Sequence, residues 1–328
     1  MNGHSGRVRV SLAGCGRWGR HILRDLLALG AEVAVADPDP EARLHAAAAG
    51  ASEAVRDLRE LGPCDGIVIA TPASTHAAVI QQALTGNVPV FVEKPLTNDA
   101  PAARLLAGQG RGRLFVMDKW RYHPGIEQLR RIRESRELGR ALGMHVLQVG
   151  WGSPQRDVDV AWTLLPHSLG IVLEVLGEVP PVKQAFAERL NGAVVGINAV
   201  LGDEPWVVVE VSERAPAKRR EFRLHCEDGV AWLHDAGAGH IHLARGGPWT
   251  GADALHVEER AISGELPLLG ELRAFVEHLR GGPEPRSSAE EGALVVERIH
   301  ELRALGVARS GSPAAAGTAP APRDTMVR

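Results

Sequence analysis

Cysteine is scarce in this sequence, and so is every feature of a secreted or membrane-spanning chain. The 328 residues include three cysteines, Cys15, Cys64 and Cys226, with neither a paired framework nor a close metal-ligand spacing. So few thiols in a chain of this length fit a reducing compartment. No apolar run approaches the roughly 20 residues that span a bilayer, and the start runs into a strand pattern without room for a signal peptide. We therefore expect a soluble, cytoplasmic protein with no membrane partner.

A surplus of basic residues is also absent. The chain has 37 Lys and Arg against 40 Asp and Glu, for a net charge of -3. Nucleic-acid binding needs a concentrated surplus of positive charge. One arginine-rich stretch exists at residues 130–140, but glutamates interleave with it at helical spacing, as on a solvated helix face with ion pairs. These features predict a protein that does not bind nucleic acid.

The first part of the chain alternates strand and helix patterns. Helical patterns separate the expected strands, and this order is typical of a parallel sheet with helices on both faces. It predicts a doubly wound Rossmann domain over residues 1–122. The expected strands are residues 7–12, 32–36, 66–70, 88–92 and 114–117.

Beyond residue 122 the pattern changes. Two helical patterns are followed by closely spaced strand patterns and two closing helices, which predicts an α+β domain with one large, mostly antiparallel open sheet over residues 123–309. A sheet covered by helices on one side only leaves an apolar face, so we expect a homodimer or homotetramer. Residues 310–328 are rich in Ala, Pro, Gly and Ser and are expected to be a disordered tail. The expected helices are residues 125–138, 160–176, 267–279 and 289–305, and the expected strands between them are residues 144–150, 182–188, 193–201, 206–212, 221–225, 230–234 and 240–244.

A glycine motif, GxGxxG, lies between the first strand and the first helix. Its first glycine permits a tight turn, its second lets a pyrophosphate approach the backbone, and its third allows the helix to pack closely on the strand. The N-terminus of the helix offers free N–H groups to an anion. The motif therefore predicts a dinucleotide-binding loop, made of Gly14, Cys15, Gly16, Arg17, Trp18 and Gly19.

An acidic residue, Asp37, ends the second expected strand, 18 residues after Gly19. A carboxylate at this position accepts hydrogen bonds from the adenosine ribose and repels a 2′-phosphate, which favours NAD over NADP. Asp37 is alternatively a turn or cap residue before Pro38. Arg43 is able to reach a 2′-phosphate, which would favour NADP.

Two further segments follow the carboxyl ends of apolar strands, the edge at which an open α/β sheet binds ligands. A lysine beside a nicotinamide can hydrogen-bond an alcohol and ease its proton away. The alternative is a surface lysine after a strand. We expect these segments to contact the coenzyme through Thr71, Pro72, His76, Glu93 and Lys94.

Five segments carry a resemblance to a known family: GCGRWG, ATPASTHAAVIQQAL, VFVEKPL, RYHP and AWTLLPHS. In order and spacing the chain resembles the glucose-fructose oxidoreductase, inositol dehydrogenase and rhizopine-catabolism (Gfo/Idh/MocA) oxidoreductases, up to about residue 309. The resemblance implies an NAD(P)-dependent dehydrogenase or reductase that acts on a secondary hydroxyl of a sugar, sugar nucleotide or cyclitol, in a biosynthetic pathway as our first choice. It also implies that Lys94 and His167 are catalytic.

The sequence departs from the family pattern beside His167. The family usually places an aspartate one turn before this histidine, where Thr163 stands, and often another three residues after it, where Gly170 stands. A threonine cannot act as a carboxylate base. This departure admits an alternative, a non-catalytic sensor or partner subunit that binds a dinucleotide or sugar. Acidic residues that precede this helix are able to replace the missing aspartate. The expected substrate-binding residues are Thr163, Arg121, Trp151 and Asp157.

A metal site is not expected. His240 and His242 share one face of a strand, but no third ligand lies at a clear spacing.

Overall fold

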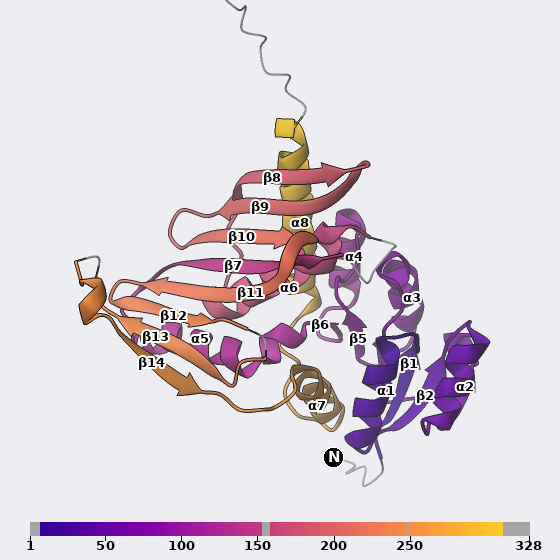
Figure 1. Ribbon diagram of the computed structural model, residues 1–328. Helices are drawn as coiled ribbons and strands as arrows, with labels where there is room; N and C mark the ends of the chain where they lie inside the picture. Colours follow the sequence, from indigo (N-terminus) through magenta and orange to yellow (C-terminus); the bar gives the residue numbers. More distant parts are fainter. Residues whose placement is uncertain (1–6, 153–157, 236, 248, 311–328) are drawn as a thin grey trace, which may run out of the picture.

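Two sheets organise the computed structural model, which describes residues 7–152, 158–235, 237–247 and 249–310 (Figure 1). The first sheet has six parallel strands in the order β3-β2-β1-β4-β5-β6. Strand order reverses between β1 and β4, so the doubly wound Rossmann domain predicted from the sequence is confirmed. Its strands are β1 (Arg9–Ala13), β2 (Glu32–Ala36), β3 (Glu53–Val55), β4 (Gly66–Ile69), β5 (Val90–Glu93) and β6 (Leu114–Met117).

The helices of this domain begin where their capping residues dictate. The Asp39 side chain accepts a hydrogen bond from the backbone N–H of Glu41 at 3.0 Å, so the second helix starts at Pro40. Strand β3 was not predicted, because three half-buried residues are too few to display a period. The helices are α1 (Gly19–Ala28), α2 (Pro40–Ala48), α3 (His76–Ala83) and α4 (Ala100–Gln109), with short 3-10 turns at η1 (Leu58–Glu60), η2 (Ala73–Thr75) and η3 (Lys119–Tyr122).

The second sheet has eight strands in the order β14-β13-β12-β11-β7-β10-β9-β8. All neighbours are antiparallel except β7 and β10, which confirms the expected large, mostly antiparallel sheet. The edge strand β14 was not predicted, because it is mostly exposed and charged and so carries no apolar alternation. The strands are β7 (Ala141–Trp151), β8 (Val182–Leu190), β9 (Ala193–Leu201), β10 (Trp206–Ser212), β11 (Arg214–Cys226), β12 (Gly229–Leu233), β13 (His240–Arg245) and β14 (His256–Ala261).

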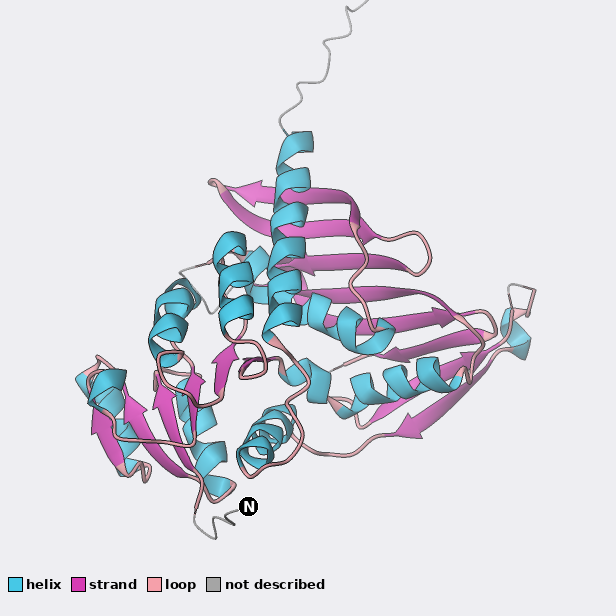
Figure 2. Cartoon of the chain, turned by 180° about the vertical axis from the view of Figure 1, so that it is seen from behind, coloured by secondary structure: helices cyan, strands magenta, loops and turns pink. Residues whose placement is uncertain are grey.

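Helices cover one face of the large sheet and leave the other open. Helix α5 (Pro124–Ser135) packs on β12 and β13, α6 (Val160–Leu176) on β7, β9 and β10, and α8 (Ala289–Ser310) on β8. They lie behind the sheet in Figure 1 and in front of it in Figure 2. Every residue of α6 is buried except Leu164 and His167, which are half-buried. Helix α6 therefore forms the centre of this domain and presents His167 at its margin.

The end of the chain returns to the Rossmann domain. Helix α7 (Pro267–Leu279) packs against α1, and Phe275 stacks on Phe91 of β5 with 4.9 Å between ring centres. The backbone N–H of Val116 in β6 donates to the carbonyl of Ser287 at 2.9 Å. These contacts join the C-terminal part of the chain to β5 and β6. The tail predicted to be disordered lies outside the described residues from 311 onward, and Ser310 is the last residue of α8. None of the described helices is both long and apolar enough to cross a membrane.

Candidate coenzyme and substrate site

The glycine turn leaves backbone exposed where a dinucleotide would approach. A Cβ on Gly14, whose φ is +94°, would lie 2.7 Å from the carbonyl oxygen of Ala70, and a Cβ on Gly19 would lie 2.2 Å from that of Gly14. A Cβ on Gly16 would meet nothing within 4 Å. The first and third glycines are therefore required by the packing of the turn, whereas the second leaves open space. No side chain caps the N-terminus of α1 beside it, so this turn fits a pyrophosphate group.

Asp37 ties the end of β2 to this turn. Its Oδ2 accepts the backbone N–H of Cys15 at 2.7 Å, and its Oδ1 accepts that of Asp39 at 2.8 Å. Each carboxylate oxygen can accept a second hydrogen bond, so the turn role and the ribose role that the sequence left open are compatible. The Arg43 guanidinium donates to the carbonyls of Asp37 and Pro38, at 2.8 Å and 2.9 Å, and lies at the same edge.

Glu93 joins the glycine turn to the lysine that follows β5. One carboxylate oxygen accepts a hydrogen bond from the Trp18 indole N–H, and the other accepts the backbone N–H of Lys94 at 3.1 Å. Burial raises the pKa of the Glu93 carboxyl, and the positive charge of Lys94 opposes that rise. The Lys119 ammonium lies 4.5 Å from the centre of the Trp18 ring. Two segments that the sequence analysis assigned to the coenzyme thus form one structure.

His76 brings the third of these segments to the same place. This buried ring lies between two carbonyl oxygens, with Nδ1 2.7 Å from that of Pro95 and Nε2 2.9 Å from that of Thr71. The Thr71–Pro72 turn is therefore held beside the Lys94–Pro95 segment. The residues expected to contact the coenzyme converge on one edge of the sheet.

Lys94 reaches across to helix α6. Its Nζ donates to the backbone carbonyl of Thr163 at 3.2 Å, one helical turn before His167. Burial lowers the pKa of the His167 imidazole well below its usual value, and the charges of Lys94, Lys119 and Arg220 lower it further. His167 is therefore neutral at physiological pH and able to accept a proton.

Asp118 is a residue of this site that the sequence analysis missed. It directly follows β6, and its Oδ1 lies 3.6 Å from Nδ1 of His167. Burial raises the pKa of its carboxyl to about 7, although the positive charge of Arg121 opposes the rise. The rule that identified Lys94, a polar side chain just past the carboxyl end of a parallel strand, applies equally to Asp118. That signal was present in the sequence.

Other candidates for substrate binding lie elsewhere or are engaged by the fold. Buried Arg121 donates to Glu174 at 2.9 Å and to Glu291 at 2.7 Å, which favours a structural ion pair over the expected role in substrate binding. Thr163 donates its hydroxyl to the Asp159 carbonyl at 3.1 Å. Trp151 is 70% exposed, and Asp157 lies outside the described residues.

Arg220 is a further cation near His167, and it lies in none of the sequence motifs. It pairs across strands with Gln148, whose side chain donates to Ser168 on α6 at 2.9 Å, so Arg220 stands on the helix-covered face of the sheet. Its guanidinium lies 5.7 Å from the centre of the Trp120 ring. Within the described part of the chain, no carboxylate lies within ion-pair distance of it. Burial lowers the pKa of Arg220, although the negative charge of Asp235 opposes this shift.

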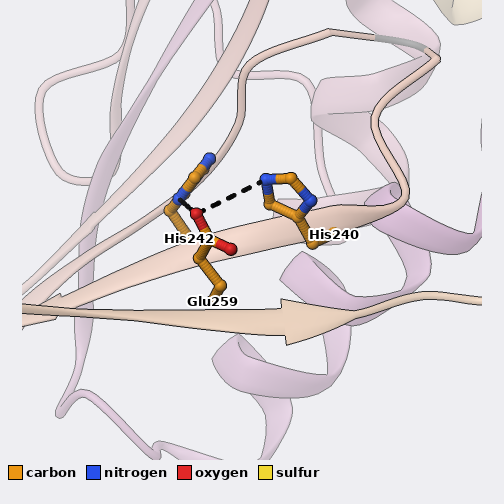
Figure 3. Close-up of side chains that lie close together, drawn as sticks. All are labelled: His240, His242 and Glu259. Atoms are coloured by element: carbon orange, nitrogen blue, oxygen red, sulfur yellow. Dashed lines mark ion pairs between the residues drawn. The ribbon is translucent and has the colours of Figure 1, made fainter.

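The pair of histidines on β13 gains a third neighbour in the structure. Glu259 of β14 lies opposite His242, and its Oε1 is 3.9 Å from His242 Nδ1 and 3.9 Å from His240 Nε2 (Figure 3). The possible ligand atoms of the three side chains lie within 4.8 Å of one another. The absence of a third ligand therefore no longer argues against a metal here. Ion pairing with Glu259 accounts for the same arrangement without one.

The fold and the glycine turn define a dinucleotide-binding protein with a second, open-sheet domain. The model of the Gfo/Idh/MocA family, described as an oxidoreductase family with an NAD-binding Rossmann fold, matches residues 8–108. Inositol 2-dehydrogenase of Burkholderia multivorans is 30% identical over 267 residues, which are 73% of this chain and 77% of that protein. This chain belongs to the Gfo/Idh/MocA oxidoreductase family, and the resemblance found in the sequence is confirmed.

Similarity to a sugar-nucleotide dehydrogenase is found in both sequence and structure. UDP-N-acetylglucosamine 3-dehydrogenase of Acidithiobacillus ferrooxidans is 28% identical over 211 residues, which are 59% of this chain and 59% of that protein. Its solved structure superposes with a TM-score of 0.82 at 22% identity and covers 94% of this chain and 100% of that one. The sequence match thus spans less than two thirds of that relative, and the superposition shows a common fold.

Proposed function

We propose that this protein catalyses NAD-dependent transfer of a hydride between the nicotinamide and a secondary hydroxyl or ketone of a sugar-like substrate. The observation that carries the proposal is the meeting of Lys94 with helix α6. Its ammonium lies 3.2 Å from the Thr163 carbonyl, one turn from His167, beside the segments that surround the glycine turn. A hydrogen-bond donor thus lies about one helical turn from a proton acceptor, and the oxidation of an alcohol needs both.

The two side chains have complementary roles in this reaction. The nicotinamide, when bound, supplies the acceptor or donor of the hydride. Neutral His167 accepts the hydroxyl proton as the carbinol carbon is oxidised, because burial keeps the pKa of its imidazole low. The Lys94 ammonium donates a hydrogen bond to the substrate oxygen and stabilises the negative charge that develops there. In the reverse direction the same groups return the proton to a ketone.

The proposal favours NAD over NADP. Buried Asp37 is fixed at the end of β2 by two backbone N–H groups, at the position from which a carboxylate accepts the ribose hydroxyls. A 2′-phosphate bound there would meet this negative charge. Arg43 would favour NADP if it bound the 2′-phosphate, but its Nη1 already donates to two carbonyl oxygens.

A sugar nucleotide is the substrate class that we favour. Arg220 places a cation near His167 with no carboxylate within ion-pair distance among the described residues, and guanidinium groups bind phosphate well. The relative from A. ferrooxidans carries a sugar nucleotide in its name. Sugar nucleotides are activated precursors, so this choice also places the reaction in biosynthesis. A free cyclitol is the second choice.

The test is formation of reduced nicotinamide, followed by its absorbance, with NAD and a panel of sugar nucleotides, free sugars and cyclitols. Lys94→Ala and His167→Ala should each lower kcat by about 10²–10⁴, the range for a positioned acid or base. NAD affinity should stay close to that of the parent protein. Lys183→Ala serves as control, because Lys183 pairs with Asp203 on the surface and should leave turnover unchanged. Turnover that survives in both site variants would reject the assignment.

The alternative function is a non-catalytic sensor or partner subunit. Thr163 and Gly170, which stand where the family usually has aspartates, are the residues that favour it. It predicts tight binding of a dinucleotide and of a sugar with no reduced nicotinamide formed in any combination.

We further propose a cytoplasmic homodimer or homotetramer. The three cysteines are free thiols, as in a reducing compartment. The open face of the large sheet exposes apolar side chains that a second copy would cover, with Phe186 58% and Val200 38% exposed.

A further inference from the structure

We propose that Asp118 takes the place of the carboxylate that helix α6 lacks and acts as the positioning residue of His167. This inference rests on the proposed function. Thr163 and Gly170 occupy the helical positions from which a neighbouring aspartate would reach His167. In this protein the carboxylate comes instead from the Rossmann domain, at the end of β6.

The side chains of Asp118 and His167 lie close together. Asp118 Oδ1 lies 3.6 Å from His167 Nδ1; the aspartate is buried and the histidine side chain is 16% exposed. Nδ1 has no hydrogen-bond partner within the described ranges of the chain, which is costly for a buried ring nitrogen. At 3.6 Å the contact is slightly longer than a hydrogen bond, as is common for catalytic pairs before substrate binds.

The glycine at position 170 is independent evidence that the Asp118 carboxylate occupies the space beside helix α6. A Cβ built on Gly170 would lie 1.7 Å from Asp118 Oδ2, far closer than two non-bonded atoms can approach. The helix therefore has a glycine where the aspartate carboxylate enters. The carboxylate also occupies the space that a side chain at position 170 would fill, so the two arrangements exclude each other.

The Asp118 side chain is held and has room to close the contact. Its Oδ1 accepts the backbone N–H of Trp120 at 3.2 Å, as the cap of η3. A cavity of about 30 Å³ adjoins it, and Lys94 and Gly170 are among the lining residues. This volume admits a shift of a few tenths of an ångström without a clash.

Charged groups from several elements surround the pair. Lys94 and Glu93 face Asp118 from the end of β5, Arg121 from η3, and Glu271 from α7; Lys119 and Arg220 face His167. Arg121 is mostly engaged by Glu174 and Glu291. Burial raises the pKa of Asp118 to about 7, so this carboxyl titrates in the neutral range.

The proposed role follows from the geometry of the imidazole. With Nδ1–H directed at the Asp118 carboxylate, the lone pair of Nε2 faces the substrate. During oxidation the hydride leaves the carbinol carbon for the nicotinamide, the hydroxyl proton passes to Nε2, and a C=O bond forms. Asp118 then stabilises the imidazolium.

The first experiment measures pH–rate profiles of Asp118→Asn. We expect kcat to fall by about 10²–10⁴, with a smaller change in KM. In the oxidation direction the rate should rise as the Asp118 carboxyl loses its proton near pH 7 and becomes able to stabilise the imidazolium, and the variant should lose this ascending limb because it has no titrating carboxyl there. Asp99→Asn, which alters the cap of α4 away from the site, should leave the profile unchanged. An unaltered profile in Asp118→Asn refutes the inference.

Moving the carboxylate from position 118 to position 170 tests whether activity depends on a carboxylate in this space. Gly170→Asp alone should lose activity, because its side chain collides with Asp118. The double variant Asp118→Ala/Gly170→Asp should recover at least about tenfold over Asp118→Ala, since the carboxylate returns to the same space from the helix. A double variant no better than Asp118→Ala, although correctly folded, counts against the proposal.

A measurement that needs no turnover separates this inference from the proposed function. In protein labelled with ¹⁵N in histidine, the His167 resonances are assigned by their loss in His167→Gln. They should report an Nδ1–H tautomer in the parent protein and an altered tautomer balance in Asp118→Asn. Altered resonances in a protein with no dehydrogenase activity would refute the proposed function and keep the pairing. Identical resonances would refute the pairing itself.

Discussion

Arg121 offers the sharpest test of whether a site residue binds substrate or holds the fold together. Its guanidinium bonds Glu174 of α6 at 2.9 Å and Glu291 of α8 at 2.7 Å, so it joins η3 to two helices of the second domain. Arg121→Met keeps the length of the side chain and removes the charge. Buried Glu174 then loses one of its cations.

The expected loss of stability depends on the cations that stay close to the Glu174 carboxylate. Breaking a buried ion pair costs about 3–5 kcal/mol when it leaves an unpaired charge. Glu174 keeps Arg130 at 3.0 Å and Arg286 at 3.5 Å, so the lower end of that range applies. With an unfolding entropy of about 2.1 cal/mol/K per residue, a loss of about 3 kcal/mol from a chain of this size lowers Tm by about 4–5 °C.

The assay is thermal unfolding followed by calorimetry, alongside steady-state kinetics. Arg131→Met is the matched control, because Arg131 is 61% exposed and lies 3.8 Å from Glu127, and such a surface pair contributes about 0–1 kcal/mol. We expect a lower Tm for Arg121→Met with a KM within about threefold of the parent value. An unchanged Tm combined with a tenfold higher KM would refute the structural role and establish Arg121 as a substrate ligand.

The remaining predictions concern the coenzyme, the assembly and the histidine cluster. Gly19→Ala should destabilise the glycine turn, because its Cβ would lie 2.2 Å from a carbonyl oxygen, whereas Gly16→Ala should keep the Tm and weaken NAD binding in calorimetric titration. Asp37→Ala should narrow the preference for NAD over NADP, and tighter NADP binding by the parent protein would contradict our choice of coenzyme. Light scattering should return a dimer or tetramer mass, and a monomer at micromolar concentration would contradict it. Treatment with EDTA should leave turnover unchanged, since ion pairs to Glu259 satisfy the β13 histidines; activity lost and restored by zinc would show a metal site.

Sequence patterns predicted those parts of the fold whose signals are local. Helix α6 and strands β2, β6, β9 and β10 match the expected bounds, because each has a continuous apolar pattern and a clear end. Strand β14 escaped prediction because an edge strand with charged, exposed residues is stabilised by pairing with β13 and not by burial of its own side chains. The long β11 was underestimated for a related reason, since its first residues are exposed and its register with β7 shifts between Arg214 and Arg219.

The residues of the site were likewise predictable from the sequence only where they have a local signal. Lys94, His167 and the glycine turn are recognisable in sequence because each lies in a motif. The place of Asp118 just after β6 is also visible in the sequence, but its pairing with His167 is not, since the two residues stand 49 positions apart and only the packing of η3 against α6 brings them together. Thr163 and Gly170 therefore read as a loss of the carboxylate when they are examined along the helix alone.

A last prediction concerns Thr163→Asp, which places an aspartate on helix α6 one turn before His167. In the parent protein Thr163→Asp should lower kcat, because the new carboxylate would stand beside Lys94, whose ammonium bonds the backbone at this position, while Asp118 already faces His167. Two carboxylates in one buried site raise each other's pKa, so the added group competes for the lysine and offers no second benefit. In the Asp118→Asn background the same substitution should raise kcat, since the helix then holds the only carboxylate next to the histidine. A higher kcat for Thr163→Asp in the parent protein would mean that His167 lacks a carboxylate partner after all.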